Sequence, residues 1–472
     1  MSRFEIFLES PYFNRSEKLL KFYRLLSAHY PKFESGSLAK ERLYGKLYGA
    51  SKYKDKTMRD LTSLLYQLAN DFIGYEQIKN DDLGLHRQRY SWLAKKGPLK
   101  LREQGIEYSE KLFMQHQVQD SQFYLHRWLA DFDKFEYQAD IFKDVEHKLI
   151  RSSDLEEHLH SLDRYYLIKY FETQLYLLSV SAIFNQPFNE AQFQHADILA
   201  QKYIEQGDVV IDLYYYLVQF EKTVDERYYD TLKTKFLAND PKVPEVLKIE
   251  IAVSLENFLA KKIRVGEEPF LKDLMGIFRF IIEHGLMYYK GEIRYYFYQN
   301  VTMAGIKAGE LDWVEQFIED FKSKISEQYR EDVYLYCKAH LLFERKKFDE
   351  ALQLALSVNP IMYFNKIDIK GLIVRIHYEL GMFEQLEIIL DSYKYYIADG
   401  KLSQEGKERY SNFVKDMRKL VRLRQNYDTK TFSLLSDHFN RTSKFPSQTW
   451  FQEKIKELVK PGISVLKQME DI

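Results

Sequence analysis

The sequence predicts an all-α protein in which pairs of antiparallel helices stack into an α-solenoid. Apolar residues recur at helical spacing almost throughout, and no segment shows the alternation of a convincing strand. Pro and Gly are sparse, at 10 and 19 residues, and they fall between the periodic segments. One pattern occurs twice, in residues 344–352 (ERKKFDEAL) and 379–387 (ELGMFEQLE), which places Phe348 and Phe383 35 residues apart. A helical unit of that length cannot bury its apolar face alone, so it must stack on neighbours.

The composition fits a large folded chain without a dominant charge. The chain has 472 residues, more than one compact core usually holds, so we expect several domains or one elongated array. The net charge is −1 with 29% charged residues, so no global field selects nucleic acid or a membrane. The hydrophobic content of 45% is enough for a packed core.

The single cysteine and the apolar runs indicate the compartment. Cys337 lies in an apolar run, which favours a buried small hydrophobe over a nucleophile, and one cysteine allows no internal disulfide. Residues 1–9 lack the apolar core of a signal peptide. The longest apolar run, residues 175–184, contains two serines and is too short to span a bilayer. We therefore expect a soluble cytoplasmic protein with no membrane partner.

Residues 1–78 are expected to form a small helical N-terminal domain. Ser16 is a plausible N-cap for a helix that ends near His29. A short helix over 38–48 and a long one over 55–73 follow, and the apolar positions of the long helix keep a spacing of three or four residues. Among the first 60 residues, 13 are Lys or Arg and 7 are Asp or Glu.

This order of helices resembles the winged-helix domain of bacterial transcriptional activators, in which a short helix precedes a longer recognition helix. The resemblance implies DNA binding at the start of the long helix, through Lys52, Lys54, Lys56 and Arg59. The segment after Ile73 departs from that family because it continues as helix and loop rather than as a β-hairpin wing. The alternative is a helical cap for the array with a solvated basic edge.

The remaining chain is expected to be helical to its end. Residues 79–160 would be a helical linker or the first solenoid layers, and Gly105 is expected to kink or interrupt a helix over 99–117. Residues 161–427 would hold the repeats, and residues 428–472 would be capping helices. The helices expected outside the two strongest units are 162–184, 188–204, 209–220, 225–237, 244–259, 268–284, 292–308, 311–325, 402–424, 429–439 and 451–458.

The repeated pattern resembles the tetratricopeptide repeat. In the first unit Ala339, Phe348, Ala351 and Pro360 occupy the small, aromatic, alanine and closing-proline positions, while Lys346-Lys347 replaces the turn glycine. In the second unit Gly381 and Phe383 fit, and Leu386 replaces the alanine. The resemblance implies a right-handed solenoid whose concave groove binds a peptide or a partner protein. First-helix residues usually line such a groove, which makes these the candidates: Tyr334, Lys338, His340, Arg345, Lys370, Arg375 and Tyr378.

Motifs for catalysis, cofactors and metals are not found in the sequence. It contains no HExxH, no GxGxxG, no GxxxxGK[ST] and no GxSxG, and the twelve histidines form no ligand pattern. We therefore expect no metal, no cofactor and no enzymatic activity. The leading hypothesis is a scaffold that binds a partner protein or peptide in the groove. The alternative is a transcriptional regulator with an N-terminal DNA-binding domain and a repeat region that senses a partner.

Overall fold

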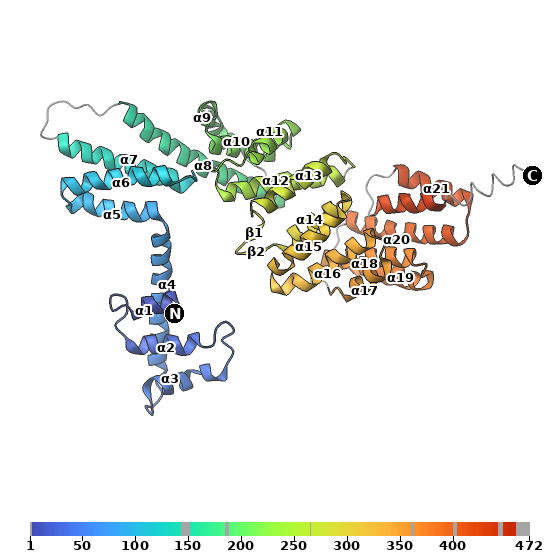
Figure 1. The fold of residues 1–472 in the computed structure, drawn as a ribbon, viewed down its shortest axis with the longest axis horizontal. Coiled ribbons are helices and arrows are strands. Elements are labelled where there is room, and N and C mark those ends of the chain that lie inside the picture. Colours follow the sequence, from blue (N-terminus) through green and yellow to red (C-terminus); the bar gives the residue numbers. More distant parts are fainter. Residues whose placement is uncertain are drawn as a thin grey trace, which may run out of the picture. The chain divides into compact units, whose positions relative to one another are not determined.

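The computed structural model describes residues 2–142, 152–184, 188–264, 266–359, 363–399, 404–441 and 447–458 (Figure 1). These residues are helical almost throughout, so the all-α prediction is confirmed. The chain divides into two compact units. One comprises Met1–Thr173 and Glu190–Gln206, and the other comprises Gln174–Asn189 and Gly207–Ile472.

The first unit begins with four helices around a small core. They are α1 (Arg3–Glu9), α2 (Glu17–Ser27), α3 (Lys40–Tyr48) and α4 (Asp55–Asn80), with a short 3-10 turn η1 (Gly36–Leu38) before α3. Ser16 caps α2 by accepting a hydrogen bond from the amide of Leu19, as its sequence position predicts. The core holds Leu8, Leu19, Phe22 and residues of α3 and α4. Helix α4 continues past Ile73 to Asn80, so the part described there is helix and not a β-hairpin.

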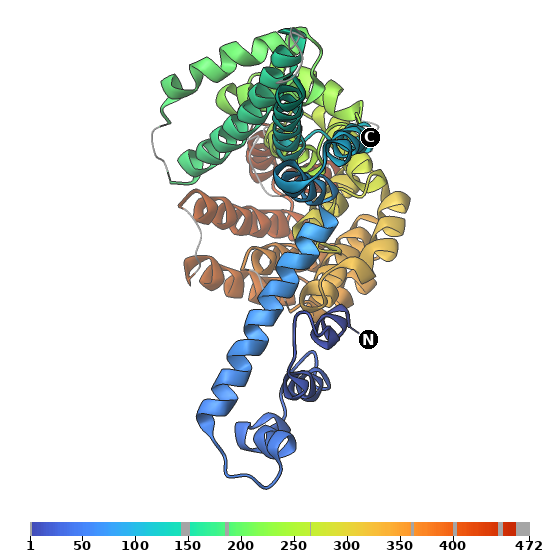
Figure 2. The ribbon, with the colours of Figure 1, turned by 90° about the vertical axis from the view of Figure 1, so that its left-hand side faces the viewer.

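Three further helices of this unit pack against one another: α5 (Asp82–Lys96), α6 (Leu99–Gln115) and α7 (Ser121–Phe142). The expected interruption at Gly105 is wrong, because α6 runs unbroken through it. Gly105 instead permits a close approach, since a Cβ there would lie 2.7 Å from Cδ2 of Tyr90 on α5. Figure 2 shows α4 as one long rod that continues into this group.

Helix α8 (Ser152–Phe184) belongs to both units, because the division falls between Thr173 and Gln174 in its interior. Leu167, Ile168 and Phe171 are completely buried on its first part. The chain then returns to the first unit through η2 (Glu190–Phe193) and α9 (Gln194–Glu205).

The second unit is a succession of helices in which each packs on the next. They are α10 (Val209–Thr223), α11 (Glu226–Leu237), α12 (Glu245–Arg264), α13 (Phe270–Glu283), α14 (Tyr295–Lys307), α15 (Leu311–Phe321), α16 (Glu327–Glu344), α17 (Phe348–Ser357), α18 (Tyr363–Glu379), α19 (Phe383–Asp399), α20 (Gln404–Gln425) and α21 (Thr429–Arg441). The 3-10 turn η3 (Lys322–Lys324) follows α15, and a last described helix covers 448–458.

One small β-hairpin corrects the expectation that no strand is present. Strands β1 (Tyr288–Tyr289) and β2 (Glu292–Ile293) pair antiparallel before α14. Lys290 and Gly291 both have positive φ, at 53° and 80°, as a tight two-residue hairpin turn requires. Strands of two residues are too short to show alternation, so the hydrophobic pattern could not reveal them.

The turns between paired helices repeat one geometry at Gly309, Lys346 and Gly381. All three have φ between 60° and 76°, in the left-handed region. In each turn the amide of the residue after the turn position donates to the carbonyl four residues before that position, which is the Schellman helix stop. Lys346 therefore stands in a position that favours glycine.

The small residues of the repeat are buried. Ala339 and Ala351 are fully buried between the packed helices α16 and α17, and Leu386 is fully buried at the alanine position of the next unit. Pro360, the expected closing proline, lies outside the described residues.

Candidate functional site

Polar side chains line the contact between α16 and α18, which we call the polar seam. Its members are Tyr336, His340 and Glu344 from α16, and Asp368, Arg375 and Glu379 from α18. The three α16 residues recur every four positions. On α18, Arg375 follows Asp368 by seven positions and Glu379 follows Arg375 by four, so each set lies on one helical face. The two helices pack against each other, which brings the two faces together.

Asp368 connects the two sides of the seam. The Tyr336 hydroxyl donates a hydrogen bond to its Oδ2, and Nε2 of His340 lies 3.6 Å from the same oxygen. The Asp368 side chain is 48% exposed, so this end of the seam is open to solvent. An outside group therefore has access to a carboxylate that is already oriented by a tyrosine.

His340 is enclosed and lacks a hydrogen-bond partner at one nitrogen. The residue is 4% exposed, and its Nε2 has no partner among the described residues. Burial lowers the pKa of His340 to about 4, although the Asp368 carboxylate opposes this change. The imidazole is therefore neutral at pH 7 and offers one unused polar atom to the seam.

Arg375 is a second group whose hydrogen-bonding capacity is not filled. Its guanidinium carbon lies 4.6 Å from the centroid of the Phe343 ring, and its buried Nε has no partner in the described part of the chain. Desolvation lowers the pKa of Arg375, while the charges of Asp368 and Glu344 act against that effect. An enclosed guanidinium with an unused N–H is costly, and such groups are frequent at binding sites.

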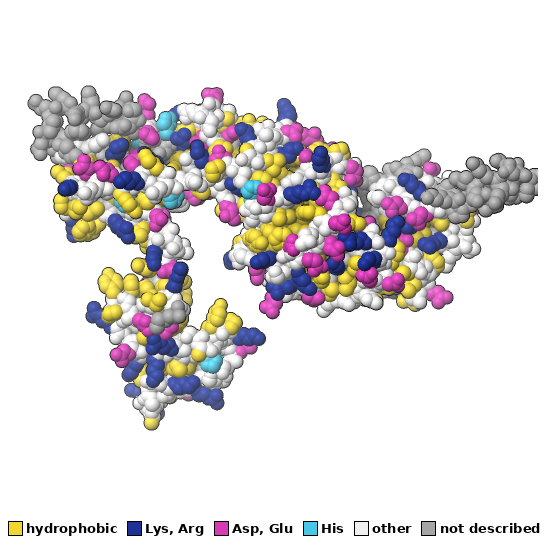
Figure 3. Space-filling view, viewed as in Figure 1, with side chains coloured by type: hydrophobic (Ala, Val, Ile, Leu, Met, Phe, Trp, Pro, Cys, Tyr) yellow, Lys and Arg dark blue, Asp and Glu magenta, His cyan; other side chains and the backbone are white. Residues whose placement is uncertain are grey.

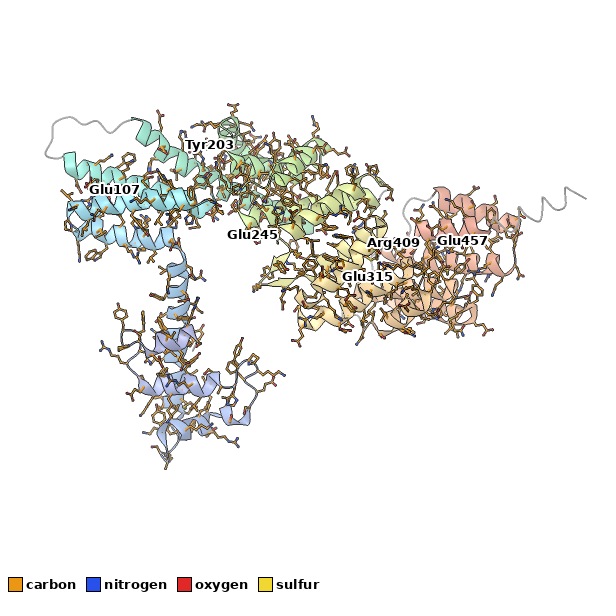
Figure 4. All side chains as sticks on the ribbon, viewed as in Figure 1. Glu107, Tyr203, Glu245, Glu315, Arg409 and Glu457 are labelled. Carbon is orange, nitrogen blue, oxygen red and sulfur yellow. The ribbon has the colours of Figure 1, made fainter. Side chains whose placement is uncertain are left out.

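Three sequence candidates lie elsewhere, on the side of α16 that faces α15. Lys338 Nζ pairs with Glu315 at 2.8 Å and with Glu319 at 2.7 Å, and Glu319 also accepts from the Tyr334 hydroxyl at 3.2 Å (Figure 4 labels Glu315). Arg345 pairs with Asp312 and Glu315, each at 2.6 Å. These side chains hold neighbouring helices together, so they are engaged within the chain.

The same arrangement recurs further along the array. Arg418 of α20 pairs with Glu387 at 2.9 Å and with Asp391 at 2.6 Å, both on α19. In both places a cation of one helix bridges two carboxylates four residues apart on the preceding helix. This ladder of ion pairs fixes adjacent helices in one register.

The remaining candidates divide between buried and accessible positions. Tyr378 is 1% exposed and His340 is 4% exposed, so neither lines an open groove, which corrects the expectation from repeat geometry. Tyr378 is covered by Trp450, whose ring centroid lies 5.3 Å away, and by Arg424. Lys370 is partly exposed on α18. The sequence candidates did not include four members of the seam, although the four-residue recurrence at 336, 340 and 344 is a readable signal: Tyr336, Glu344, Asp368 and Glu379.

The N-terminal candidates are accessible. Lys52, Lys54 and Lys56 are exposed where α4 begins, and Arg59 is exposed but pairs with Asp55 at 3.0 Å. The side chain of Lys54, the N-cap residue of α4, makes no capping hydrogen bond. Figure 3 shows Lys and Arg side chains spread over the N-terminal helices, with few acidic ones among them.

The described residues hold neither a clustered set of metal-ligand side chains nor a membrane-spanning helix. No group of three or more His, Cys, Asp or Glu in this part of the chain is placed to hold a metal ion. Within the same residues, no helix combines the length and the apolar character needed to cross a bilayer.

Comparison with known proteins gives no match to a family model, to a curated protein or to a solved structure. The proposals that follow are therefore based on the chain's own geometry.

Proposed function

We propose that the protein is a non-enzymatic scaffold that binds a segment of a partner protein along the polar seam. The observation that carries the proposal is the half-exposed carboxylate of Asp368, which the Tyr336 hydroxyl already orients; behind it lie two buried atoms without a partner among the described residues, Nε of Arg375 and Nε2 of His340. A peptide group offers a carbonyl acceptor and an N–H donor together, so it complements a guanidinium and a carboxylate at once. The ion-pair ladder supports this role because it keeps the seam rigid before binding.

Capture from native lysate with the full-length tagged chain tests this proposal. The variant Arg375→Met with Asp368→Asn removes both charges of the seam at similar volume, and Arg345→Met is the matched control on the opposite face of α16. The expected result is a stoichiometric protein partner that survives nuclease, is lost from the seam variant and is kept by the control. Equal recovery by both variants, with circular dichroism showing both folded, contradicts the proposal.

A second candidate function is DNA binding by the N-terminal domain, with the repeats sensing a partner. It is favoured by the exposed cluster of Lys52, Lys54 and Lys56 at the start of α4, next to Arg59. Phosphate contacts of this kind release counterions, so affinity should fall with salt by a log–log slope of about −0.9 per contact.

Fluorescence anisotropy with a labelled duplex measures this dependence. The charge reversal of Lys54, Lys56 and Arg59 to Glu should abolish binding. Reversal of Lys79, an exposed lysine at the other end of α4, should leave it intact. Binding that is unchanged by the triple reversal removes this site from consideration.

A further inference from the structure

The last described helix, over 448–458, is held by a defined set of side chains that we call the C-terminal seat. Its residues Trp450, Phe451, Lys454 and Ile455 are buried and share one helical face. The Trp450 ring lies 5.3 Å from that of Tyr378, and the Phe451 ring lies 5.7 Å from Phe413 and 4.8 Å from Phe439. The seat therefore consists of Tyr378, Glu379, Phe413 and Phe439.

Glu379 makes the seat selective for a cation and an indole. It accepts a hydrogen bond from Nε1 of Trp450 at 2.6 Å and forms an ion pair with Nζ of Lys454 at 2.8 Å. The side chains of Glu379 and Lys454 are each 10% exposed. A desolvated ion pair adds little to stability compared with an apolar contact. A helix without the lysine would leave the Glu379 carboxylate buried and unpaired, which is costly, so the pair favours a helix with a cation at this position.

The seat is continuous with the polar seam, because Glu379 belongs to both. Desolvation raises the pKa of Glu344 on the α16 side of the seam; the Arg375 charge opposes this effect, and the carboxylates of Glu453 and Glu379 add to it. A partner segment that lies on the seam and extends toward Glu379 would meet the helix over 448–458.

We propose that the C-terminal seat is a binding site for an amphipathic helix with an aromatic pair followed by a lysine, and that the chain's own helix is its resident occupant. A partner helix with the same pattern enters only when residues 448–458 leave, so release of the C-terminal helix and partner binding are coupled. This inference rests on the proposed scaffold function, for which it names the class of partner segment.

A fluorescein-labelled peptide with the sequence of residues 447–458 (SQTWFQEKIKEL) tests the seat on the full-length chain. The Lys454→Glu variant places a carboxylate on the chain's own helix over 448–458, where Glu379 repels it. The peptide keeps its lysine and can still pair with Glu379. The peptide should therefore bind this variant at least about tenfold more tightly than it binds the wild type. Adding Glu379→Lys should remove that gain, and a peptide with Trp450 and Lys454 replaced by Ala should not bind.

Equal affinity of the peptide for the wild type and Lys454→Glu, with both folded by circular dichroism, overturns the inference. If Lys454→Glu does not fold, Lys454→Ala serves in the same comparison with the same criterion. The outcome is separable from the proposed function because the labelled peptide reports on the seat alone, whereas the capture from lysate reports on the seam. If the seam variant loses the partner but the peptide binds no variant, the proposed scaffold function stands and the inference about the seat is wrong.

Discussion

At the scale of single residues, His340 makes the stability of the second unit depend on pH. Its pKa is lowered to about 4 by burial, whereas an unfolded histidine binds its proton near 6.5. The unfolded chain therefore gains protons first as the pH falls, and the second unit loses stability between about pH 7 and pH 4. The loss should be on the order of 2–3 kcal/mol at the acid end.

Urea unfolding of His340→Leu at pH 7.5 and pH 4.5 checks this expectation. The variant should show a smaller loss of stability on acidification than the wild type, because it has no buried imidazole to protonate. His116→Leu, which replaces an exposed histidine, should behave like the wild type. A wild-type pH dependence that persists in His340→Leu would contradict the argument.

At the scale of elements, the helix stop at Lys346 carries a cost that glycine would remove. Lys346 has φ of 60°, in a region where a Cβ is unfavourable by about 1 kcal/mol. Lys346→Gly should therefore raise the free energy of unfolding by roughly 0.5–1 kcal/mol, since the side chain is exposed and little packing is lost. Gly381→Ala, at φ of 71° in the equivalent turn, should lower it by a similar amount. Chemical denaturation of the two variants should show shifts of opposite sign; shifts of the same sign would exclude the shared turn geometry as their cause.

The elements also show which features of the fold a sequence reveals. The helices could be predicted because apolar spacing and capping are local properties of the sequence. The ion pairs of Lys338 and Arg345 could not, since their partners Glu315 and Asp312 lie on another helix and no local pattern connects them. Tyr378 was expected in a groove because its cover, Trp450, is distant in sequence. Of the seam, Arg375 and His340 were found and Asp368 was missed, because the surroundings of a side chain depend on packing.

At the scale of the whole molecule, the two units should respond to acid in opposite directions. Asp131 belongs to the first unit, and burial raises its pKa to about 6, although Arg127 at 3.2 Å opposes this. Because the folded state holds this proton more tightly, its contribution to stability is present at pH 4 and is lost as the pH rises through about 6. The histidine of the second unit has the opposite sign.

Heating at pH 5 and at pH 7.5, followed by limited proteolysis and mass spectrometry, compares the units directly. At each pH, the temperature at which cleavage begins is compared between the two units. The temperature for the second unit, relative to that for the first, should be lower at pH 5 than at pH 7.5. Asp131→Asn should stabilise the first unit at pH 7.5 by roughly 1–2 kcal/mol and have little effect at pH 4. An unchanged order of cleavage at the two pH values would show that these groups do not control the balance between the units.

The helix shared by the two units limits how the gene can be divided. Every cut within residues 152–184 leaves both products with a truncated α8. A cut between residues 184 and 190 separates residues 190–206 from the first unit, and a cut after residue 206 separates residues 174–189 from the second. No single cut therefore yields both units complete: residues 1–206 hold all of the first unit and residues 174–472 hold all of the second, so two complete fragments must share residues 174–206. Complementation by two co-expressed fragments therefore has to overlap across α8, and recombination between related genes should preserve this region as one block.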